Sequence, residues 1–225
     1  MVDGKKMSKL NVVYEDNHII VVEKPINVPT QADDSKDLDM LTMVKEYVKE
    51  KYNKPVNVYI GLVHRLDRPV GGIMVFARTS KAAARLTEQV KNHTFKKEYY
   101  AVVEGKAKES DELRDFLLKD SKTNITKVDK NGKEAILNYK LIEFRDGYSL
   151  VDVDLKTGRS HQIRVQFSSR NLPLYGDQKY NKNSKVGEQL ALFSKKITFM
   201  HPITKENITF ELKLPNRKPF DMFIK

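Results

Sequence analysis

Apolar runs of six or seven residues, separated by short polar turns, dominate the hydrophobic pattern of this chain. Residues 58–63 and 71–77 are two such runs, and the glycine and proline around them predict two buried strands that flank a turn. A third strand-like run covers residues 148–154. Because buried strands are rigid, we expect a side chain at a turn between them to be held firmly in place.

One segment has helical spacing, and another predicts a hairpin. Apolar residues recur over 40–48 as in an amphipathic helix, with Asp39 as the expected first residue. The polar interval 31–39 before this helix predicts a loop that follows a first strand pair. Asn131-Gly132 lies between residues 124–128 and 135–139 and predicts a β-hairpin. Lysines on its turn could touch a phosphate backbone, although exposed hairpins also carry lysine for solubility.

The length of 225 residues suits one large domain or two small ones, and it is enough to bury about 70–75% of the unfolded surface. Because no linker, repeat or low-complexity tract divides the chain, we expect a single domain over 11–225 after a flexible tail at 1–10. No apolar run approaches the roughly 20 residues of a membrane span, and the first residues lack the apolar stretch of a signal peptide. We therefore expect a cytoplasmic protein.

The composition is basic and lacks cysteine. The formal net charge is +11, the pI is about 9.5, and lysines are spread along the whole chain. A basic surface attracts RNA phosphates, but many small basic proteins bind no nucleic acid, so charge only supports such a function. The absence of cysteine excludes disulfides, thiolate nucleophiles and cysteine-ligated zinc.

The tetrapeptide His64-Arg65-Leu66-Asp67 occupies the predicted turn between the first two buried strands. It presents a carboxylate beside an arginine. A rigid, partly dry carboxylate is a candidate nucleophile or base. The ordinary alternative is that Asp67 caps a helix or forms a surface ion pair.

A second polar cluster follows the strand-like run at 148–154. Arg159, His161, Gln162 and Arg164 fall within six residues, after a turn predicted by Thr157-Gly158. The segment could be a strand or the start of a helix, and in a helix His161 and Arg164 would share one face. Such a face is too polar for a core, so the alternative to a functional cluster is a solvated basic helix.

The sequence implies neither a metal nor a cofactor. No His-x-x-x-His pair occurs, and Arg65 and Arg159 would repel a cation from the usable donors, which are His64, Asp67, His161 and His201. Gly71-Gly72 lacks the Lys-Ser/Thr of a phosphate-binding loop and the spacing of a dinucleotide site.

Five segments, taken in order, resemble motifs of the RluA-type RNA pseudouridine synthases. Residues 64–72 resemble the catalytic motif of that family, His-Arg-Leu-Asp followed by a short turn. The other four are the Lys-Pro turn at 14–25, Lys-x-Tyr-x-Ala at 97–105, Thr-Gly-Arg-x-His-Gln-Ile-Arg at 157–164, and Gly-Asp-x-x-Tyr at 174–180. The resemblance extends over roughly residues 12 to 212. Gly71 and Asn181 depart from the usual Ser and Gly at two turns, which leaves the subfamily and the substrate open.

The resemblance implies an enzyme that isomerises uridine to pseudouridine in RNA. It makes Asp67 the catalytic carboxylate and Arg164 the arginine that pairs with it. Tyr99 would stack on the uracil with its hydroxyl near C5, although a strand tyrosine can equally be part of the core. Arg65 would fill the gap left by the flipped uridine, unless it forms a salt bridge to a neighbouring acid. His64 would brace the turn or contact RNA.

The same resemblance implies an α+β fold, a mostly antiparallel, twisted, mixed sheet flanked by helices with the active-site cleft in its centre. Arg159, His161 and Gln162 are assigned to RNA or structural contacts. Only about ten residues precede the first strand, so we expect a catalytic core without an S4 module. Such a core, expected to be a monomer without a protein partner, would bind a structured RNA such as a ribosomal or transfer RNA stem-loop. We expect loops 30–39 and 123–133 to select the uridine.

Two other functions fit some of these residues. An RNA-binding protein could keep the fold and lose catalysis, although the presence of Asp67, Tyr99 and Arg164 argues against this. A hydrolase could use Asp67 and His161, but it would require water in a site that pseudouridine chemistry must keep dry.

Overall fold

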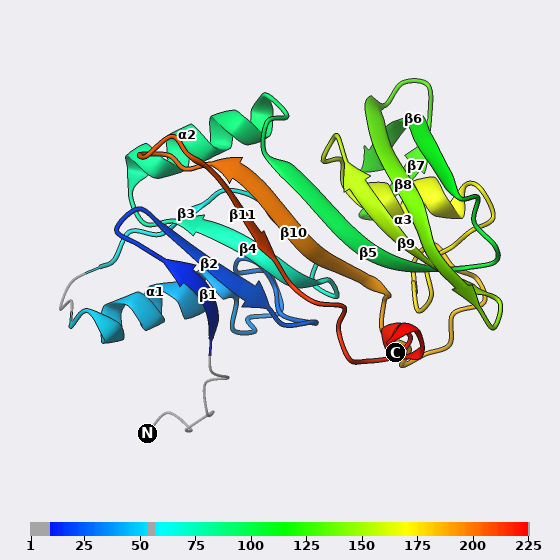
Figure 1. Ribbon diagram of the computed structural model, residues 1–225, viewed down its shortest axis with the longest axis horizontal. Coiled ribbons are helices and arrows are strands. Elements are labelled where there is room, and N and C mark those ends of the chain that lie inside the picture. Colours follow the sequence, from blue (N-terminus) through cyan, green and yellow to red (C-terminus); the bar gives the residue numbers. More distant parts are fainter. Residues whose placement is uncertain (1–9, 54–56, 225) are drawn as a thin grey trace.

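The computed structural model describes residues 10–53 and 57–224, and its main element is one eleven-stranded sheet (Figure 1). The expected tail at 1–10 lies almost wholly outside the described residues. The strand order is β1-β2-β4-β10-β5-β9-β8-β6-β7, with β3 paired to β4 and β11 paired to β10. Every described pairing except β4 with β10 is antiparallel, so the sheet is mixed and mostly antiparallel, as predicted.

The strands divide into two groups along the sheet, and β5 and β10 run through the middle (Figure 1). The first group holds β1 (Asn11–Glu15), β2 (Ile19–Lys24), β3 (Gly61–Leu62) and β4 (Gly71–Ala77). The second holds β6 (Ser110–Asp120), β7 (Ile125–Val128), β8 (Lys133–Arg145) and β9 (Tyr148–Leu155). The central strands are β5 (Lys96–Glu104) and β10 (Leu192–Met200), and β11 (Asn207–Glu211) lies beside β10.

The helices cover both faces of the sheet. α1 (Met40–Lys51) and α3 (Gln162–Ser168) pack on one face, in a core cluster that also contains Tyr99 of β5. α2 (Ser80–Lys91) packs on the opposite face, where alternate residues of β2 and β4 meet Ala82 and Leu86. A 3₁₀ turn (Phe220–Phe223) closes the same opposite face farther along the sheet. The face that carries α1 and α3 therefore has a helix near each end and the central strands between them.

The predicted helix over 40–48 is confirmed. Asp39 has extended backbone angles, and its carboxylate accepts the backbone N–H of Thr42 at 3.1 Å, so it caps α1 as expected. The predicted buried strand at 71–77 is also confirmed, since every residue of β4 is buried. At 58–63, however, the strand is much shorter than predicted. Only Gly61 and Leu62 pair with β4, and the Tyr59 side chain is half exposed.

The predicted hairpin around Asn131-Gly132 is wrong. β7 and β8 do not pair with each other, because β6 lies between them: Leu117 is opposite Val128 on one side and Lys133 on the other. A Cβ on Gly132 would lie 2.3 Å from the Leu117 carbonyl carbon, so only glycine lets the chain pass so close to β6. Asn131-Gly132 is therefore the place where the chain crosses β6 on its way from β7 to β8. The hairpin in this region is formed by β6 and β7.

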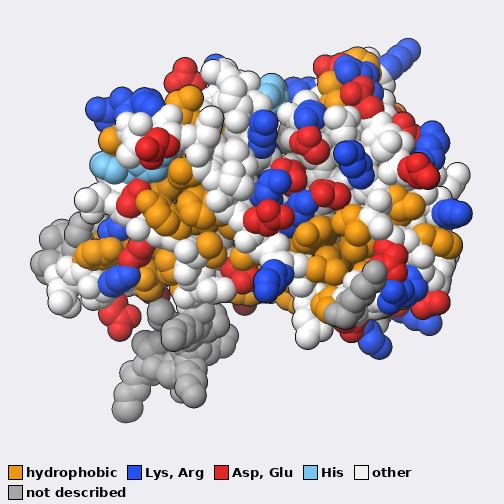
Figure 2. Space-filling view, viewed as in Figure 1, with side chains coloured by type: hydrophobic (Ala, Val, Ile, Leu, Met, Phe, Trp, Pro, Cys, Tyr) orange, Lys and Arg blue, Asp and Glu red, His pale blue; other side chains and the backbone are white. Residues whose placement is uncertain are grey.

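No helix within the described ranges combines the length and hydropathy that a membrane crossing requires. Over the face drawn in Figure 2, lysine and arginine side chains alternate with acidic ones, so that face presents a mixed charge.

Candidate active site

A cavity of about 650 Å³ opens between the turn before β4 and the start of α3. This volume lies within the range of ligand-binding pockets. All the residues predicted for the site line it: His64, Arg65, Asp67, Tyr99, Arg159, His161, Gln162 and Arg164. Its other charged residues are mostly basic, since Arg68, Lys97 and Lys119 also line it and Asp33 is the one further carboxylate. The cavity is therefore more basic than the face in Figure 2.

The turn that carries Asp67 is tied down on both sides of this residue. The hydroxyl of Thr30 accepts the backbone N–H of Leu66 at 3.2 Å and donates to its carbonyl at 2.9 Å. On the other side, the buried ammonium of Lys24 donates to the carbonyl of Arg68 at 3.0 Å. The Asp67 backbone is thus fixed, while its side chain keeps 35% of its exposure to solvent.

His64 braces the same turn from beneath. Its side chain is buried, its Nε2 accepts the backbone N–H of Val75 at 3.2 Å, and its ring lies 5.3 Å from that of Phe95. Burial, together with the nearby charge of Lys97, lowers the pKa of His64 to about 3, so the ring is neutral. Of the two roles expected for His64, this geometry favours bracing over RNA contact.

Arg164 contacts Asp67, the partner predicted for it, but its shorter hydrogen bonds go to Asp177. Its guanidinium donates twice to Asp177, from Nε at 2.8 Å and from Nη2 at 2.6 Å, and reaches Asp67 Oδ2 from Nη1 at only 3.4 Å. Asp177 is fully buried, so it offers a desolvated carboxylate that the fork of the guanidinium can grip. Burial opposes the charge of Arg164, but the hydrogen bonds and the charge of Asp177 outweigh it and raise the arginine pKa.

The polar face of α3 is buried, and the alternative of a solvated basic helix is wrong. Gln162, Arg164 and Gln166 are each 5% exposed or less. The side-chain oxygen of Gln162 accepts from the Thr157 hydroxyl and from the backbone N–H of Arg159. Its side-chain NH₂ donates to the backbone carbonyl of Ile136 and to the side-chain oxygen of Gln166. A polar face can enter the core because its groups are satisfied inside the protein. Since the Gln162 amide is fully used, the geometry favours its structural role over RNA contact.

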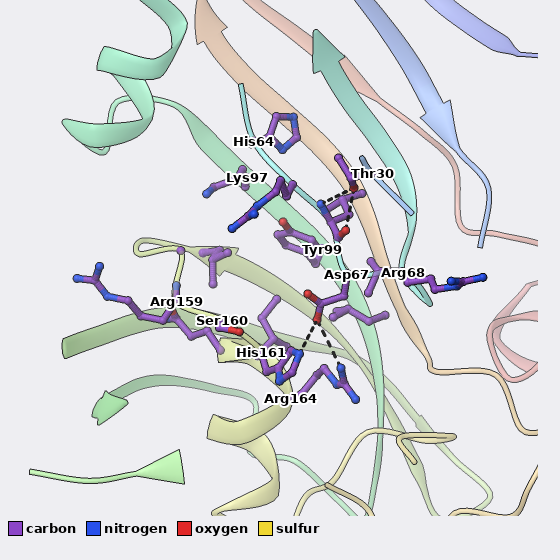
Figure 3. A pocket seen from close by; sticks show the side chains of 18 of the residues that line it. Thr30, His64, Asp67, Arg68, Lys97, Tyr99, Arg159, Ser160, His161 and Arg164 are labelled. Atoms are coloured by element: carbon purple, nitrogen blue, oxygen red, sulfur yellow. Dashed lines mark hydrogen bonds and ion pairs between the residues drawn. The ribbon is translucent and has the colours of Figure 1, made fainter. Parts of the chain in front are cut away.

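His161 immediately precedes α3 and has left-handed backbone angles, with φ of 53°. Its side chain is 7% exposed. Nδ1 lies 2.6 Å from the Tyr180 hydroxyl, and Nε2 lies 3.8 Å from Asp67 Oδ2 (Figure 3). His161 and Arg164 therefore approach the same oxygen of Asp67 from the beginning of α3.

Tyr99 lies on β5 behind Asp67 (Figure 3) and is 5% exposed. Its ring belongs to the core cluster beneath α1 and α3, and it also lines the cavity. The core reading and the functional reading of this residue are thus compatible. Burial first, and then the charge of Asp67, raises the pKa of the Tyr99 phenol, so the side chain is neutral at neutral pH.

Three arginines at the mouth of the cavity differ in their partners. Arg65 is exposed and makes no hydrogen bond or ion pair with any residue that the structure describes. Arg68 points away from Asp67 in Figure 3. It binds loop 31–38 through Ser35 at 2.9 Å and through Asp37. Arg159 also points away, and its Nε donates to the Glu134 carbonyl at 2.8 Å.

Sequence reasoning gave no role to four residues that support the site. Lys24, Asp177 and Tyr180 stood inside quoted motifs, and each proves to position a site residue. Burial lowers the pKa of Lys24 to about 7. Lys97, two residues before Tyr99 on β5, lines the cavity with no acidic partner within the described chain, and burial lowers its pKa as well. The motif match was the available signal for all four.

No three metal-binding side chains cluster anywhere in the described ranges. Besides the exposed Asp33, the cavity contains one half-buried carboxylate, Asp67, together with a buried aromatic ring and fixed donors. This set can hold a flat, uncharged base against Tyr99 and place a carboxylate beside it.

Comparison with known proteins agrees with this site. The family model of RNA pseudouridylate synthase matches residues 18–169. The uncharacterized RNA pseudouridine synthase YhcT of Bacillus subtilis is 32% identical over 92% of this chain and 69% of its own length. The ribosomal large subunit pseudouridine synthase C of Buchnera aphidicola is 31% identical over 92% of this chain and 70% of its own length.

Solved structures show the same fold. Human RNA pseudouridylate synthase domain containing 4 superposes with a TM-score of 0.77 at 19% identity, covering 91% of this chain and 88% of that one. Human RNA pseudouridylate synthase domain containing 1 gives 0.78 at 20% identity, with 95% and 87% covered. The chain belongs to the RNA pseudouridylate synthase family, and within it to the RluA-type proteins. It is an enzyme that isomerises uridine to pseudouridine in RNA.

Proposed function

We propose that Asp67 is the catalytic carboxylate of this enzyme and that the substrate is a uridine in a structured ribosomal or transfer RNA. The observation that carries the proposal is the position of the Asp67 side chain. It stands in the cavity beside Tyr99, on a turn fixed by Thr30 and Lys24. Its Oδ2 faces Arg164 and His161, and its Oδ1 has no partner among the described residues.

The reaction breaks the bond between ribose C1′ and uracil N1, turns the base and joins C5 to C1′. Atoms are conserved, and the step needs a carboxylate at the ribose and base together with a pocket that retains the free uracil. Asp67 supplies the carboxylate, and the guanidinium of Arg164 lies 3.4 Å from its Oδ2. Tyr99, as a neutral phenol, stacks on the uracil with its hydroxyl close to C5.

A uridine inside folded RNA must leave its stack before it can reach Asp67, which costs a few kcal/mol. Arg65 then fills the gap that the flipped uridine leaves in the RNA stack. Its guanidinium is exposed at the cavity mouth and has no partner in the described chain, so it can enter the RNA without breaking a contact. Guanidinium groups stack well on bases.

The net charge of +11 and the basic lining of the cavity support binding to the RNA backbone. The Bacillus subtilis relative is named only as an uncharacterized RNA pseudouridine synthase, whereas the Buchnera enzyme is named for the large ribosomal subunit. We therefore favour a ribosomal stem-loop, bound by a cytoplasmic monomer. Loop 31–38, held by Arg68 beside the site, and the β6–β7 hairpin, which contributes Lys119 to the cavity, would select the uridine.

Tritium release tests the role of Asp67. The enzyme is incubated with cellular RNA that carries tritium at uridine C5, and we expect release by the wild type and none by Asp67→Asn. Asp146→Asn is a matched control, because Asp146 is exposed and has φ of 49°, a conformation that asparagine tolerates. Full release by Asp67→Asn would refute the proposal. Tight RNA binding without release by the wild type would identify an inactive binder of the same fold.

The substrate is tested separately. Pseudouridines are mapped in RNA from cells that lack the gene, and we expect a site in a ribosomal stem-loop to disappear. If a transfer RNA site disappeared instead, the proposed reaction would stand, but the substrate would be a transfer RNA.

A further inference from the structure

The hydroxyl of Tyr180 lies between a backbone donor and a histidine ring. It accepts the N–H of Thr126 on β7 at 2.9 Å and lies 2.6 Å from Nδ1 of His161. A phenol carries one proton, and the His161 nitrogen is an acceptor at 2.6 Å, while the Thr126 hydroxyl also lies beside the phenol. If Nδ1 carried a proton instead, the hydroxyl would face two N–H donors, one from Thr126 and one from His161. The satisfied arrangement has Tyr180 donating to Nδ1, which places the proton of a neutral ring on Nε2.

The surroundings of His161 favour a neutral ring. Burial lowers the pKa of His161, and the positive charges of Arg164, Lys179 and Lys119 lower it further, while Asp67 opposes them. These groups face the ring from α3, from the segment that carries Tyr180 and from β6. A neutral ring with its proton on Nε2 would direct that N–H toward Oδ2 of Asp67.

Two donors converge on one oxygen of Asp67. His161 Nε2 lies 3.8 Å from Oδ2, and Arg164 Nη1 lies 3.4 Å from the same atom (Figure 3). Both distances are longer than a good hydrogen bond, and catalytic hydrogen bonds often shorten when substrate binds. Closing the histidine gap takes a movement of about 1 Å. Oδ1 is left without a protein partner in the described chain.

We propose that His161 is a positioning residue whose Nε2–H, fixed by Tyr180, donates to Oδ2 of Asp67 in the RNA complex and leaves Oδ1 as the oxygen that reacts. This inference rests on the proposed catalytic role of Asp67. It narrows the expectation of RNA or structural contacts for His161 to a structural one. It also links the β6–β7 hairpin to the reaction, because the Thr126 N–H on that hairpin fixes the direction in which the Tyr180 hydroxyl donates.

The tautomer can be measured directly in the full chain. Nitrogen-15 labelling of the five histidines allows each ring to be read by NMR, and His161→Asn assigns the signals of His161. We expect a neutral Nε2–H ring at pH 7.5 in the wild type. In Tyr180→Phe we expect a mixture of tautomers, because the donor to Nδ1 is lost. An Nδ1–H ring or an imidazolium in the wild type would overturn the inference without any assay of activity.

Turnover provides the second measurement. We expect Tyr180→Phe to lower kcat about 10-fold and His161→Asn to lower it about 10- to 100-fold, with KM nearly unchanged. Asparagine tolerates the left-handed backbone at this position but does not reach Asp67. His161→Gln, whose longer amide can donate near the Nε2 position, should recover part of the loss. Tyr175→Phe is the control, since the Tyr175 ring contacts Tyr148, and it is Tyr180, not Tyr175, that bonds His161.

The outcomes separate this inference from the proposed function. A raised KM with unchanged kcat in His161→Asn would make His161 an RNA contact and refute the positioning role. If Asp67→Asn is inactive and His161→Asn turns over like the wild type, this inference alone fails. If Asp67→Asn remains active, the proposed function fails, and the positioning role fails with it.

Discussion

Asp67 and Asp177 are two carboxylates on either side of one arginine, and the protein treats them in opposite ways. Asp177 is fully buried and accepts two N–H groups from Arg164, together with the backbone N–H groups of Lys179 and Tyr180. Asp67 is 35% exposed and has one contact with Arg164, at 3.4 Å. The saturated carboxylate fixes the arginine, while the sparsely bonded one is the carboxylate that we propose to react. Hydrogen bonds that hold a carboxylate firmly also occupy the lone pairs that chemistry needs.

The largest effect should come from removing the free carboxylate. We expect Asp67→Asn to lower the rate of tritium release by about 10⁴-fold or more, the size of loss seen when a central catalytic group is removed. The free energy of unfolding should change by less than about 1 kcal/mol, because Asp67 is partly exposed and Arg164 keeps Asp177. Single-turnover assays and urea denaturation measure the two quantities. A loss of several kcal/mol would show that Asp67 is structural too.

Removing the saturated carboxylate should instead damage stability first. We expect Asp177→Asn to lower the free energy of unfolding by about 3–5 kcal/mol, because it leaves the buried Arg164 without its main partner. Activity of the remaining folded protein should fall as well, since Arg164 loses its orientation. Asp111→Asn is the control: Asp111 pairs with the exposed Lys108, and its loss should cost less than about 1 kcal/mol. If Asp177→Asn and Asp111→Asn lowered the free energy of unfolding equally, the structural role given to the buried Asp177 would be contradicted.

The turn beneath Asp67 should give the protein a measurable acid sensitivity. The pKa of His64 is about 3 in the folded protein and near 6.5 when unfolded, so the unfolded chain binds the proton first as pH falls. The free energy of unfolding is therefore unaffected by the protonation of His64 above pH 6.5, and it falls as the pH is lowered from 6.5 to 3. From pH 7.5 to 5.0 the loss should be about 2 kcal/mol. Urea denaturation of the wild type and His64→Gln at both values measures it, and identical pH slopes would exclude His64 as the cause.

The smallest effect should come from Arg65, which has no partner in the described part of the chain. We expect Arg65→Ala to lower kcat/KM about 10-fold on a folded stem-loop and much less on a short unstructured RNA, where no stack must be opened. Stability should not change. Arg114→Ala removes another exposed arginine, one that pairs with Glu112 and Glu134 away from the cavity, and should leave both rates unchanged. An equal loss on both RNAs would point to simple phosphate attraction.

Local patterns predicted local structure well. Asp39 and the apolar spacing after it predicted α1, and the unbroken apolar run at 71–77 predicted β4, because both signals lie within a few adjacent residues. The two failures were pairings. At 58–63 most of the run remains unpaired, and at 131–133 the turn signal could not reveal that β6 lies between β7 and β8. Which strands pair depends on segments distant in sequence.

The sequence by itself determined the family and the residues gathered at the cavity, because five motifs in order carry that information in the identity of side chains. Only the tertiary structure decided how those residues share their bonds. Arg164 is 97 residues from Asp67 and 13 from Asp177, and no spacing indicates that the nearer carboxylate receives its two short hydrogen bonds. The reason is burial: folding removes water from Asp177 and leaves Asp67 partly wet, and a desolvated carboxylate requires the stronger partner.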